Sequence, residues 1–240
     1  MRAAKGTGKR HKRELRMQQI LISAIAHDIR TPLRYFMLTA RSLQQDLARG
    51  GETGAAFLDR AELMYASAEK MHALVEELLN YSRIWLSGNG KIRFLTTPLY
   101  PEVAAKLDLF QPIARSKGIA LVNNVAEQVS IATDPDCFSV ILHNVLDNAV
   151  KFTAEGEVAV RSLTEGQEVL LEITDTGRGM NKNYMDWFNK EDAPLDDHFR
   201  PPGLGLLLIK ELMHKVKGRT TVSKGGNTGT TITLAFPVTM

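Results

Sequence analysis

The 240-residue chain has a single cysteine, Cys137, and lacks any long uninterrupted apolar run. A helix that spans a membrane needs about 20 consecutive, mostly apolar residues, and a lone cysteine cannot form an internal disulfide. The first residues are basic and polar, without the apolar core of a signal peptide. These absences argue against a secreted disulfide scaffold and against a bundle of membrane helices. We expect a protein of the reducing cytoplasm.

Charge is unevenly distributed along the chain. The first 16 residues carry seven basic side chains and one acidic one, whereas the whole chain has a formal net charge of only +3, so the rest is mildly acidic. A basic arm can bind nucleic acid, lie against anionic lipid or serve as a solvated linker. No aromatic side chain interleaves with these charges, which argues against nucleic acid. We predict that residues 1–13 are a basic juxtamembrane linker or a segment added by cloning. In the first case, a sensor or membrane segment lies upstream of this sequence.

The first part of the chain predicts two long helices. From about Glu14 to Arg49, apolar residues recur at steps of three and four, the period of an amphipathic helix. A glycine-rich turn at 50–54 follows, and a coiled-coil pattern then runs from about Ala55 to Leu86. Two such helices form an antiparallel hairpin. Because one hairpin has too little core, we expect two copies to pair into a four-helix bundle.

His27 lies off the apolar stripe of the first helix. It is two residues from both Ile25 and Ile29, which places it roughly 200° around the helix from each. A solvent-facing imidazole beside the carboxylate of Asp28 is available to an outside reagent. A histidine on a polar helix face is usually only solvated. A functional role for His27 is therefore predicted only together with the motifs in the rest of the chain. Pro32 is expected to kink the helix just after His27.

The second part alternates between strand-like and helix-like segments, after a break at 87–90. Such a mixture favours an α/β sandwich, with one layer of helices on one mixed sheet. The stretch 180–202 is polar and has no period, so it is predicted to be irregular. Strands are predicted at 91–99, 119–125 and 129–133, and in two hairpins at 157–163 with 168–175 and 219–223 with 230–236. Helices are predicted at 101–117, from Asp134 or Asp136 to Phe152, and at 203–216.

One face of the helix that ends at Phe152 carries two amides and an ammonium group. Asn144 and Asn148 are four residues apart and Lys151 is three further on, so the three share a face. Magnesium prefers oxygen ligands and keeps several waters, so this set suits a hydrated cation with a polyphosphate. Taken alone, the same residues are more often a solvated helix face.

Two glycine-rich turns complete the pattern. The first, Asp175 to Gly179, follows an apolar strand, and its glycines let the backbone approach a ligand closely. The carboxylate of Asp175 can accept a hydrogen bond from an exocyclic amine such as adenine N6. The second, Gly203-Leu204-Gly205, opens an apolar helix, where free N–H groups and the helix dipole favour phosphate. Each turn is common when isolated.

Taken together and in this order, these features resemble the sensor histidine kinases over nearly the whole chain. The resemblance implies a fold of an antiparallel helical hairpin that forms a dimeric four-helix bundle, at 14–88. An α/β sandwich of the histidine-kinase ATPase type follows, at 91–240. The matching motifs are the phosphoacceptor box at 27–33, the N box at 144–153, the two glycine boxes at 175–179 and 203–206, and a remnant of the phenylalanine box at Trp187-Phe188.

The resemblance also implies roles in phosphoryl transfer. His27 would accept the γ-phosphoryl group of ATP, Asp28 would hydrogen-bond the imidazole, and Thr31 would position water for phosphatase activity toward the partner. The partner would be the receiver domain of a response regulator, which takes the phosphoryl group on an aspartate. The chain would act as a homodimer without nucleic acid, on the cytosolic side of a membrane-anchored sensor and tied to the membrane only through its upstream segment.

The cofactors implied are ATP and Mg²⁺. Asn148 would hold the metal with Asn144 nearby, and Lys151 would meet phosphate. Phe152 would contact the adenine ring and Asp175 would bind adenine N6. The remaining positions would shape the pocket and the lid at 180–202, and they are Gly177, Gly179, Gly203, Leu204 and Gly205.

Two departures from the family pattern keep an alternative open. Asp28 stands where glutamate is more usual, and Pro201-Pro202 stand where a glycine is usual. Proline fixes φ and lacks an N–H donor, which puts the lid in question. The alternative is a nucleotide-binding pseudokinase, a scaffold that dimerises and docks a partner without phosphotransfer. An ATPase of the gyrase and chaperone class resembles only the second half of the chain.

Overall fold

A computed structural model of the chain describes residues 26, 29–48, 54–86, 92–190, 204–226 and 228–237. The chain divides into two compact units, 1–80 and 81–240. The division falls within the helix α2 (Ala55–Leu86), and the domain boundary predicted at 88–91 lies outside the described residues. Within the described ranges, no helix is both long and apolar enough to cross a membrane.

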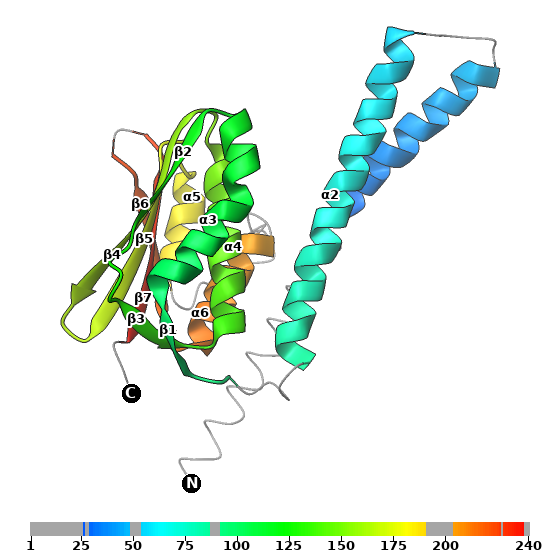
Figure 1. Cartoon of the computed structure of the whole chain (residues 1–240). Coiled ribbons are helices and arrows are strands. Elements are labelled where there is room, and N and C mark those ends of the chain that lie inside the picture. Colours follow the sequence, from blue (N-terminus) through cyan, green and yellow to red (C-terminus); the bar gives the residue numbers. More distant parts are fainter. Residues whose placement is uncertain are drawn as a thin grey trace. The chain divides into compact units, whose positions relative to one another are not determined.

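The first unit contains the predicted pair of helices, which Figure 1 shows side by side in blue and cyan. Residues 29–48 are helical, and α2 has the predicted bounds. An ion pair between Arg60 of α2 and Asp46 joins the two helices. The expected helix start near Glu14 and the turn at 50–53 lie outside the described residues. The helix continues through Pro32 without a break, and a bend there stays a prediction.

The predicted apolar stripes of the hairpin stay accessible within one chain. Leu33 is 42% exposed, Leu47 57% and Val75 45%. Ile29, Phe36 and other members of the stripes are only half-buried. A single hairpin therefore leaves apolar surface in water, which costs free energy that a second hairpin would recover.

The second unit is built on a five-stranded sheet of order β2-β4-β5-β7-β6. The pair β2 and β4 is parallel and the other pairs are antiparallel. Both predicted hairpins are confirmed, and Gly166 makes the first turn at a φ of 58°. The strands are β2 (Ile119–Asn124), β4 (Gly156–Glu165), β5 (Glu168–Asp175), β6 (Arg219–Lys224) and β7 (Thr230–Pro237).

The described strands form a second, small sheet that is not hydrogen-bonded to the main one. It pairs β1 (Leu95–Pro98) with β3 (Ser130–Thr133) in antiparallel register. The first predicted strand, 91–99, is shorter than expected at both ends. Residues 92–94 precede the paired register, and Pro98 already serves as the N-cap of the next helix. This pairing connects the residues just before the helix at Leu99–Ser116 with those just before the helix α4 (Pro135–Phe152).

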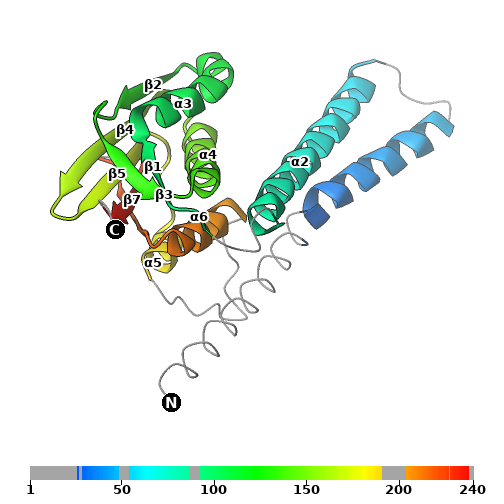
Figure 2. The same cartoon turned by 60° about the horizontal axis from the view of Figure 1, so that its bottom comes forward.

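A layer of helices covers one face of the main sheet, as Figures 1 and 2 show. Buried side chains alternate along β5, where Val169, Leu171 and Ile173 face the helices. Phe138 and Phe236 meet edge to face across this core, with ring centroids 5.7 Å apart. The α/β sandwich is confirmed. Its helices are α3 (Leu99–Ser116), α4 (Pro135–Phe152), α5 (Lys182–Asn189) and α6 (Leu204–Lys215).

The helix α5 corrects the prediction that 180–202 is irregular throughout. Asn181 caps it by accepting a hydrogen bond from the N–H of Asn183, and Trp187 and Phe188 are buried. At its C-terminal end, the ammonium group of Lys210 donates to the carbonyls of Phe188 (2.9 Å) and Lys190 (2.6 Å). The prediction is wrong for 182–189 because one helix of eight residues is too short to show a period, and 191–200 lie outside the described residues.

Candidate nucleotide site

The helix α4 begins with a well-formed cap. Asp134 is the N-cap, and its Oδ1 accepts hydrogen bonds from the N–H groups of Asp136 and Cys137. Pro135 occupies the first helical position, where its missing N–H costs nothing. Of the two caps that the sequence allowed, the structure uses Asp134. The cap fixes the start of the helix that carries Asn144, Asn148 and Lys151.

The asparagines of α4 lie against the start of α6. A Cβ added to Gly205 would lie 2.8 Å from Oδ1 of Asn144 and 3.7 Å from Nδ2 of Asn148. Asn144 is buried, and its Nδ2 donates to the carbonyl of Val140 at 2.8 Å. The N-x-x-x-N helix and the second glycine turn therefore meet, as a common nucleotide site requires.

Asp175 ends β5 in a buried position. Its Oδ1 accepts hydrogen bonds from the N–H of Gly177 (2.9 Å) and from the N–H of Thr230 (3.2 Å). Burial raises the pKa of this carboxyl, and the two hydrogen bonds offset part of that rise because they favour the ionised form. Both backbone bonds fall on Oδ1, and the side chain of Thr230 also hydrogen-bonds the carboxylate. Because a carboxylate has about four lone-pair sites, it can still accept a bond from a ligand.

The first glycine turn is fixed to the end of α4. A Cβ on Gly177 would lie 2.4 Å from the carbonyl oxygen of Phe152, so only glycine fits there without a shift. The N–H of Arg178 donates to that same oxygen at 3.3 Å. Gly179 adopts a φ of 77°, in the left-handed region that glycine favours. The turn therefore places Asp175 and Phe152 next to each other.

Cationic side chains gather at the C-terminal end of α4, where the helix dipole favours them. The Phe152 ring is 40% exposed, with the guanidinium carbon of Arg178 at 4.7 Å and the ammonium of Lys151 at 5.6 Å from its centroid. The ammonium of Lys117 donates to the carbonyl of Val150 at 2.8 Å. Sequence reasoning identified Lys151 and Phe152 but missed Arg178 and Lys117.

Two family models match the chain. The "His Kinase A (phospho-acceptor) domain" matches residues 17–84, and the "Histidine kinase-, DNA gyrase B-, and HSP90-like ATPase" matches residues 133–240. The chain belongs to the sensor histidine kinases. ATPases of the gyrase and chaperone class have no phosphoacceptor domain. The match at 17–84 therefore argues against assigning the chain to that class.

Curated relatives include a sensor kinase/phosphatase and a sensor protein. The chain is 29% identical to the "Autoinducer 2 sensor kinase/phosphatase LuxQ" of Vibrio harveyi over 233 residues, which cover 90% of this chain and 26% of that protein. It is 27% identical to the "Sensor protein EvgS" of Escherichia coli (strain K12), covering 90% of this chain and 18% of that protein. The chain thus spans only a minor part of the length of these curated relatives.

Solved structures of histidine kinases share the fold. The Acinetobacter baumannii histidine kinase AdeS aligns with a TM-score of 0.63 at 19% identity, over 88% of this chain and 98% of that chain. Histidine kinase ThkA, solved in complex with the response regulator protein TrrA, aligns with a TM-score of 0.69 at 17% identity, over 99% of this chain and 67% of that chain.

Several residues that the sensor histidine kinase pattern predicts lie outside the described part of the chain. They are His27, Asp28 and Gly203, and the Pro201-Pro202 pair that departs from the pattern also lies outside it. Thr31 is helical and exposed, and Leu204 is buried at the start of α6. The described residues that converge on the ends of α4, β5 and α6 are Asn144, Asn148, Lys151, Phe152, Asp175, Gly177, Gly179 and Gly205.

The sequence offers a signal for one of the two missed cationic residues, Arg178 and Lys117, but not for the other. Arg178 stands inside the D-x-G-x-G stretch, so its place in the motif could have marked it. Lys117 is the C-cap of α3 and lies 33 residues before Val150, whose carbonyl accepts its hydrogen bond. No local pattern marks such a contact, because it exists only once α3 and α4 lie together.

Proposed function

We propose that this chain is the catalytic part of a larger sensor, an ATP-dependent autokinase that phosphorylates His27. The phosphoryl group then passes to an aspartate of a response regulator. The observation that carries the proposal is the convergence of two motifs on one helix: Gly205 lies against Asn144 and Asn148, and Gly177 lies against Phe152. A nucleotide bound along this end of α4 would meet both glycine turns.

In the proposed complex, each described residue contacts one part of ATP. The carboxylate of Asp175 accepts a hydrogen bond from the adenine N6 amine, and the exposed ring of Phe152 contacts the base. The ammonium group of Lys151 meets the phosphates as a point charge. The N-terminus of α6 adds free N–H groups and a favourable dipole near Gly205. Gly203 and the lid at 180–202 belong to the same proposal, with α5 as a fixed part of that stretch.

The donor set at α4 suits a magnesium ion that arrives with its nucleotide. Among the described residues, no group of three or more His, Cys, Asp or Glu side chains could hold a metal by itself. Magnesium is commonly held by one or two protein ligands together with substrate phosphates and water. The amide of Asn148, half-buried beside Gly205, could supply one oxygen. Magnesium would neutralise phosphate charge in the transfer step.

In the transfer step, an imidazole nitrogen of His27 forms a bond to the γ-phosphorus while the bond from that phosphorus to the bridging oxygen breaks. ADP leaves with the electron pair of the broken bond. The ordinary pKa of histidine is about 6.5, so the neutral nucleophile is abundant at cell pH. Asp28 would accept a hydrogen bond from the other ring nitrogen. Thr31, one turn beyond, is exposed and could position water when the partner is dephosphorylated.

The proposed assembly is a homodimer on the cytosolic side of a membrane. Exposed apolar side chains on both helices of the hairpin support pairing with a second copy, and Leu47 and Val75 are examples. The response regulator would dock on the hairpin near His27. Attachment to a membrane would come only through sequence upstream of residue 1.

The test of the proposal is transfer of label from γ-labelled ATP to the purified chain with Mg²⁺. We expect an acid-labile phosphoprotein that is absent in His27→Gln and normal in His72→Gln, which alters an exposed histidine on α2. Label that persists in His27→Gln would contradict the proposed acceptor. Nucleotide binding without any label on the wild-type chain would favour the scaffold reading, for which Pro201-Pro202 is the sequence argument.

A further inference from the structure

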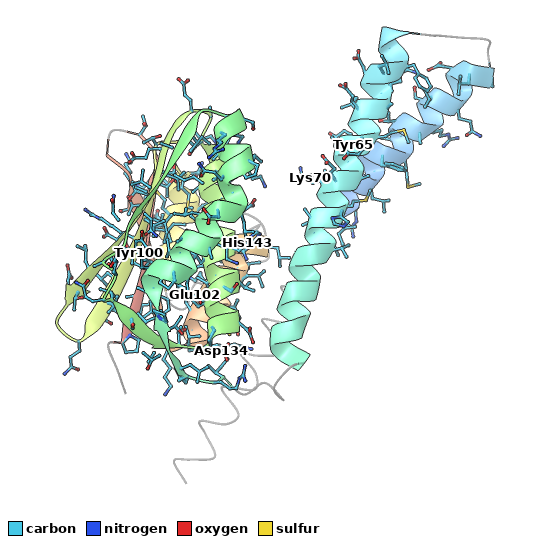
Figure 3. All side chains as sticks on the ribbon, viewed as in Figure 1. Tyr65, Lys70, Tyr100, Glu102, Asp134 and His143 are labelled. Carbon is cyan, nitrogen blue, oxygen red and sulfur yellow. The ribbon has the colours of Figure 1, made fainter. Side chains whose placement is uncertain are left out.

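The residues just before β1 are fixed to the start of α4 by one carboxylate. The N–H of Arg93 donates to Oδ2 of Asp134 at 2.9 Å. The other oxygen, Oδ1, caps α4 by accepting from the N–H groups of Asp136 and Cys137 at 3.1 and 3.2 Å. Asp134 is buried, and Figure 3 labels it at the lower end of α4. A single side chain therefore caps the helix and holds the connector, residues 92–94.

A second contact joins the connector to the end of α6. The ammonium group of Lys217 lies 5.4 Å from the ring centroid of Phe94. Lys217 lies two residues after α6 and has a φ of 59°. Its N–H and that of Gly218 donate to the carbonyls of His214 and Met213, which terminates the helix. The Arg93 guanidinium is 3.7 Å from the Asp136 carboxylate, but both are largely exposed and such a pair contributes little.

The connector is held at the end of α4 and α6 that is remote from the nucleotide residues. The helices run antiparallel, because Gly205 at the start of α6 lies against Asn144 and Asn148 in the second half of α4. At the other end, burial raises the pKa of the Cys137 thiol to about 12. Asp134 adds to this rise, and the charge of Lys215, at the end of α6, opposes it. With a rise of 1.5 Å per residue, Asp134 lies about 20 Å along α4 from Asn148.

From this geometry we propose that Asp134 and Phe94 are positioning residues for phosphoryl transfer. They fix where the chain leaves the ATPase domain toward the hairpin that carries His27, without touching the nucleotide. The proposal rests on the proposed function, since it assumes that a phosphoryl group passes from the ATPase domain to the hairpin. A misplacement of about 1 Å can slow such a step roughly a hundredfold.

The substitution Asp134→Asn separates the two tasks of this side chain. Asparagine is as good an N-cap as aspartate, so the bonds to Asp136 and Cys137 can persist. Its amide nitrogen donates and cannot accept the Arg93 N–H. We expect an unchanged dissociation constant for ATP and a fall of about tenfold in the labelling rate of His27 at saturating ATP. Asp108→Asn, which removes the same charge from an exposed position on α3, should change neither quantity.

Phe94→Ala supplies a second, independent variant in case Asp134→Asn fails to fold. It removes the ring beside Lys217 but leaves the cap of α4 intact, and the same split between binding and rate is expected. Labelling rates equal to wild type in the folded variants would overturn the inference. An equal loss of ATP affinity and rate would overturn it too, because the residues would then act on the nucleotide site.

Amide hydrogen exchange at Arg93 tests the attachment itself without any activity. We expect a protected amide in the wild-type chain, exchange about fivefold faster in Asp134→Asn, and no change in Asp108→Asn. An Arg93 amide that exchanges equally fast in both chains would overturn the inference. A wild-type chain without label on His27 would instead overturn the proposed function, which keeps the two failures distinct.

Discussion

Arg178 shows how a single side chain can prepare a binding surface. Its backbone N–H holds the carbonyl of Phe152, and its guanidinium covers the ring of the same residue at 4.7 Å. A cation over an aromatic face contributes about 0.5–1 kcal/mol at an exposed site. Main chain and side chain of Arg178 thus both contact Phe152 and restrict the positions that its ring can take.

The substitution Arg178→Ala tests this role. We expect the affinity for ADP and for ATP to fall by the same factor, about three- to fivefold, because the loss concerns the ring and not the phosphates. Arg178→Lys should retain part of the affinity. Arg161→Ala, an exposed arginine of β4 paired with Glu172, serves as the control. Titration of a fluorescent nucleotide analogue measures the affinities, and a larger loss for ATP than for ADP would show that Arg178 acts on phosphate instead.

Among the elements, α5 depends most on contacts from elsewhere in the chain. Lys210 of α6 lies 4.9 Å above the Trp187 ring and donates to three carbonyls at the C-terminal end of α5. Hydrogen bonds from a charged group contribute about 1.5–3 kcal/mol each at most. A helix of two turns is marginal by itself, so these bonds decide whether it forms.

We expect Lys210→Met to loosen α5 and to lower the free energy of unfolding by about 1–3 kcal/mol. Methionine keeps the apolar contact with Trp187 and Phe188 but cannot donate to the carbonyls. Denaturant unfolding measures the loss. The chain has a second tryptophan, Trp85, so the emission of buried Trp187 reports on α5 alone only in a Trp85→Phe background. Lys224→Met on the exposed side of β6 provides the comparison. An unaltered spectrum and midpoint in Lys210→Met would refute this account of the helix.

The elements also show what a sequence can and cannot predict here. The two antiparallel hairpins and the bounds of α2 followed from alternation, helical period and glycine turns, all of which are local signals. Of the predicted site residues on α4, helical spacing grouped Asn144, Asn148 and Lys151, whereas Phe152 came from the resemblance to the sensor histidine kinases. The pairing of β1 with β3, the helix α5 and the cap from Lys117 depend on residues far along the chain. No local pattern carries that information.

For the whole molecule, the apolar surface of the hairpin determines the expected assembly. Leu47 is 57% exposed in a single chain, and it belongs to the stripe predicted to face a second hairpin. Two symmetric copies bury the same patch on each subunit, so one substitution acts twice. Assembly and labelling of His27 are then linked through the concentration of the chain.

We expect Leu47→Lys to raise the dimer dissociation constant about a hundredfold, since two lysines would have to leave water. Sedimentation equilibrium over a range of concentrations measures this constant. The matched control is Leu109→Lys, at a 67% exposed position of α3 in the ATPase domain, which should leave the constant as it is. Equal association of all three chains would contradict the proposed interface.

The strand β6 lies at one edge of the main sheet, and the side-chain amide of Asn189 occupies part of that edge. Asn189 both donates to the carbonyl of Val222 (2.9 Å) and accepts from its N–H (2.7 Å), on the side of β6 away from β7. An incoming strand from another molecule would need those same two backbone groups to extend the ladder. While α5 is folded, β6 therefore cannot pair at Val222 with a strand from another molecule, and aggregation through this edge is hindered.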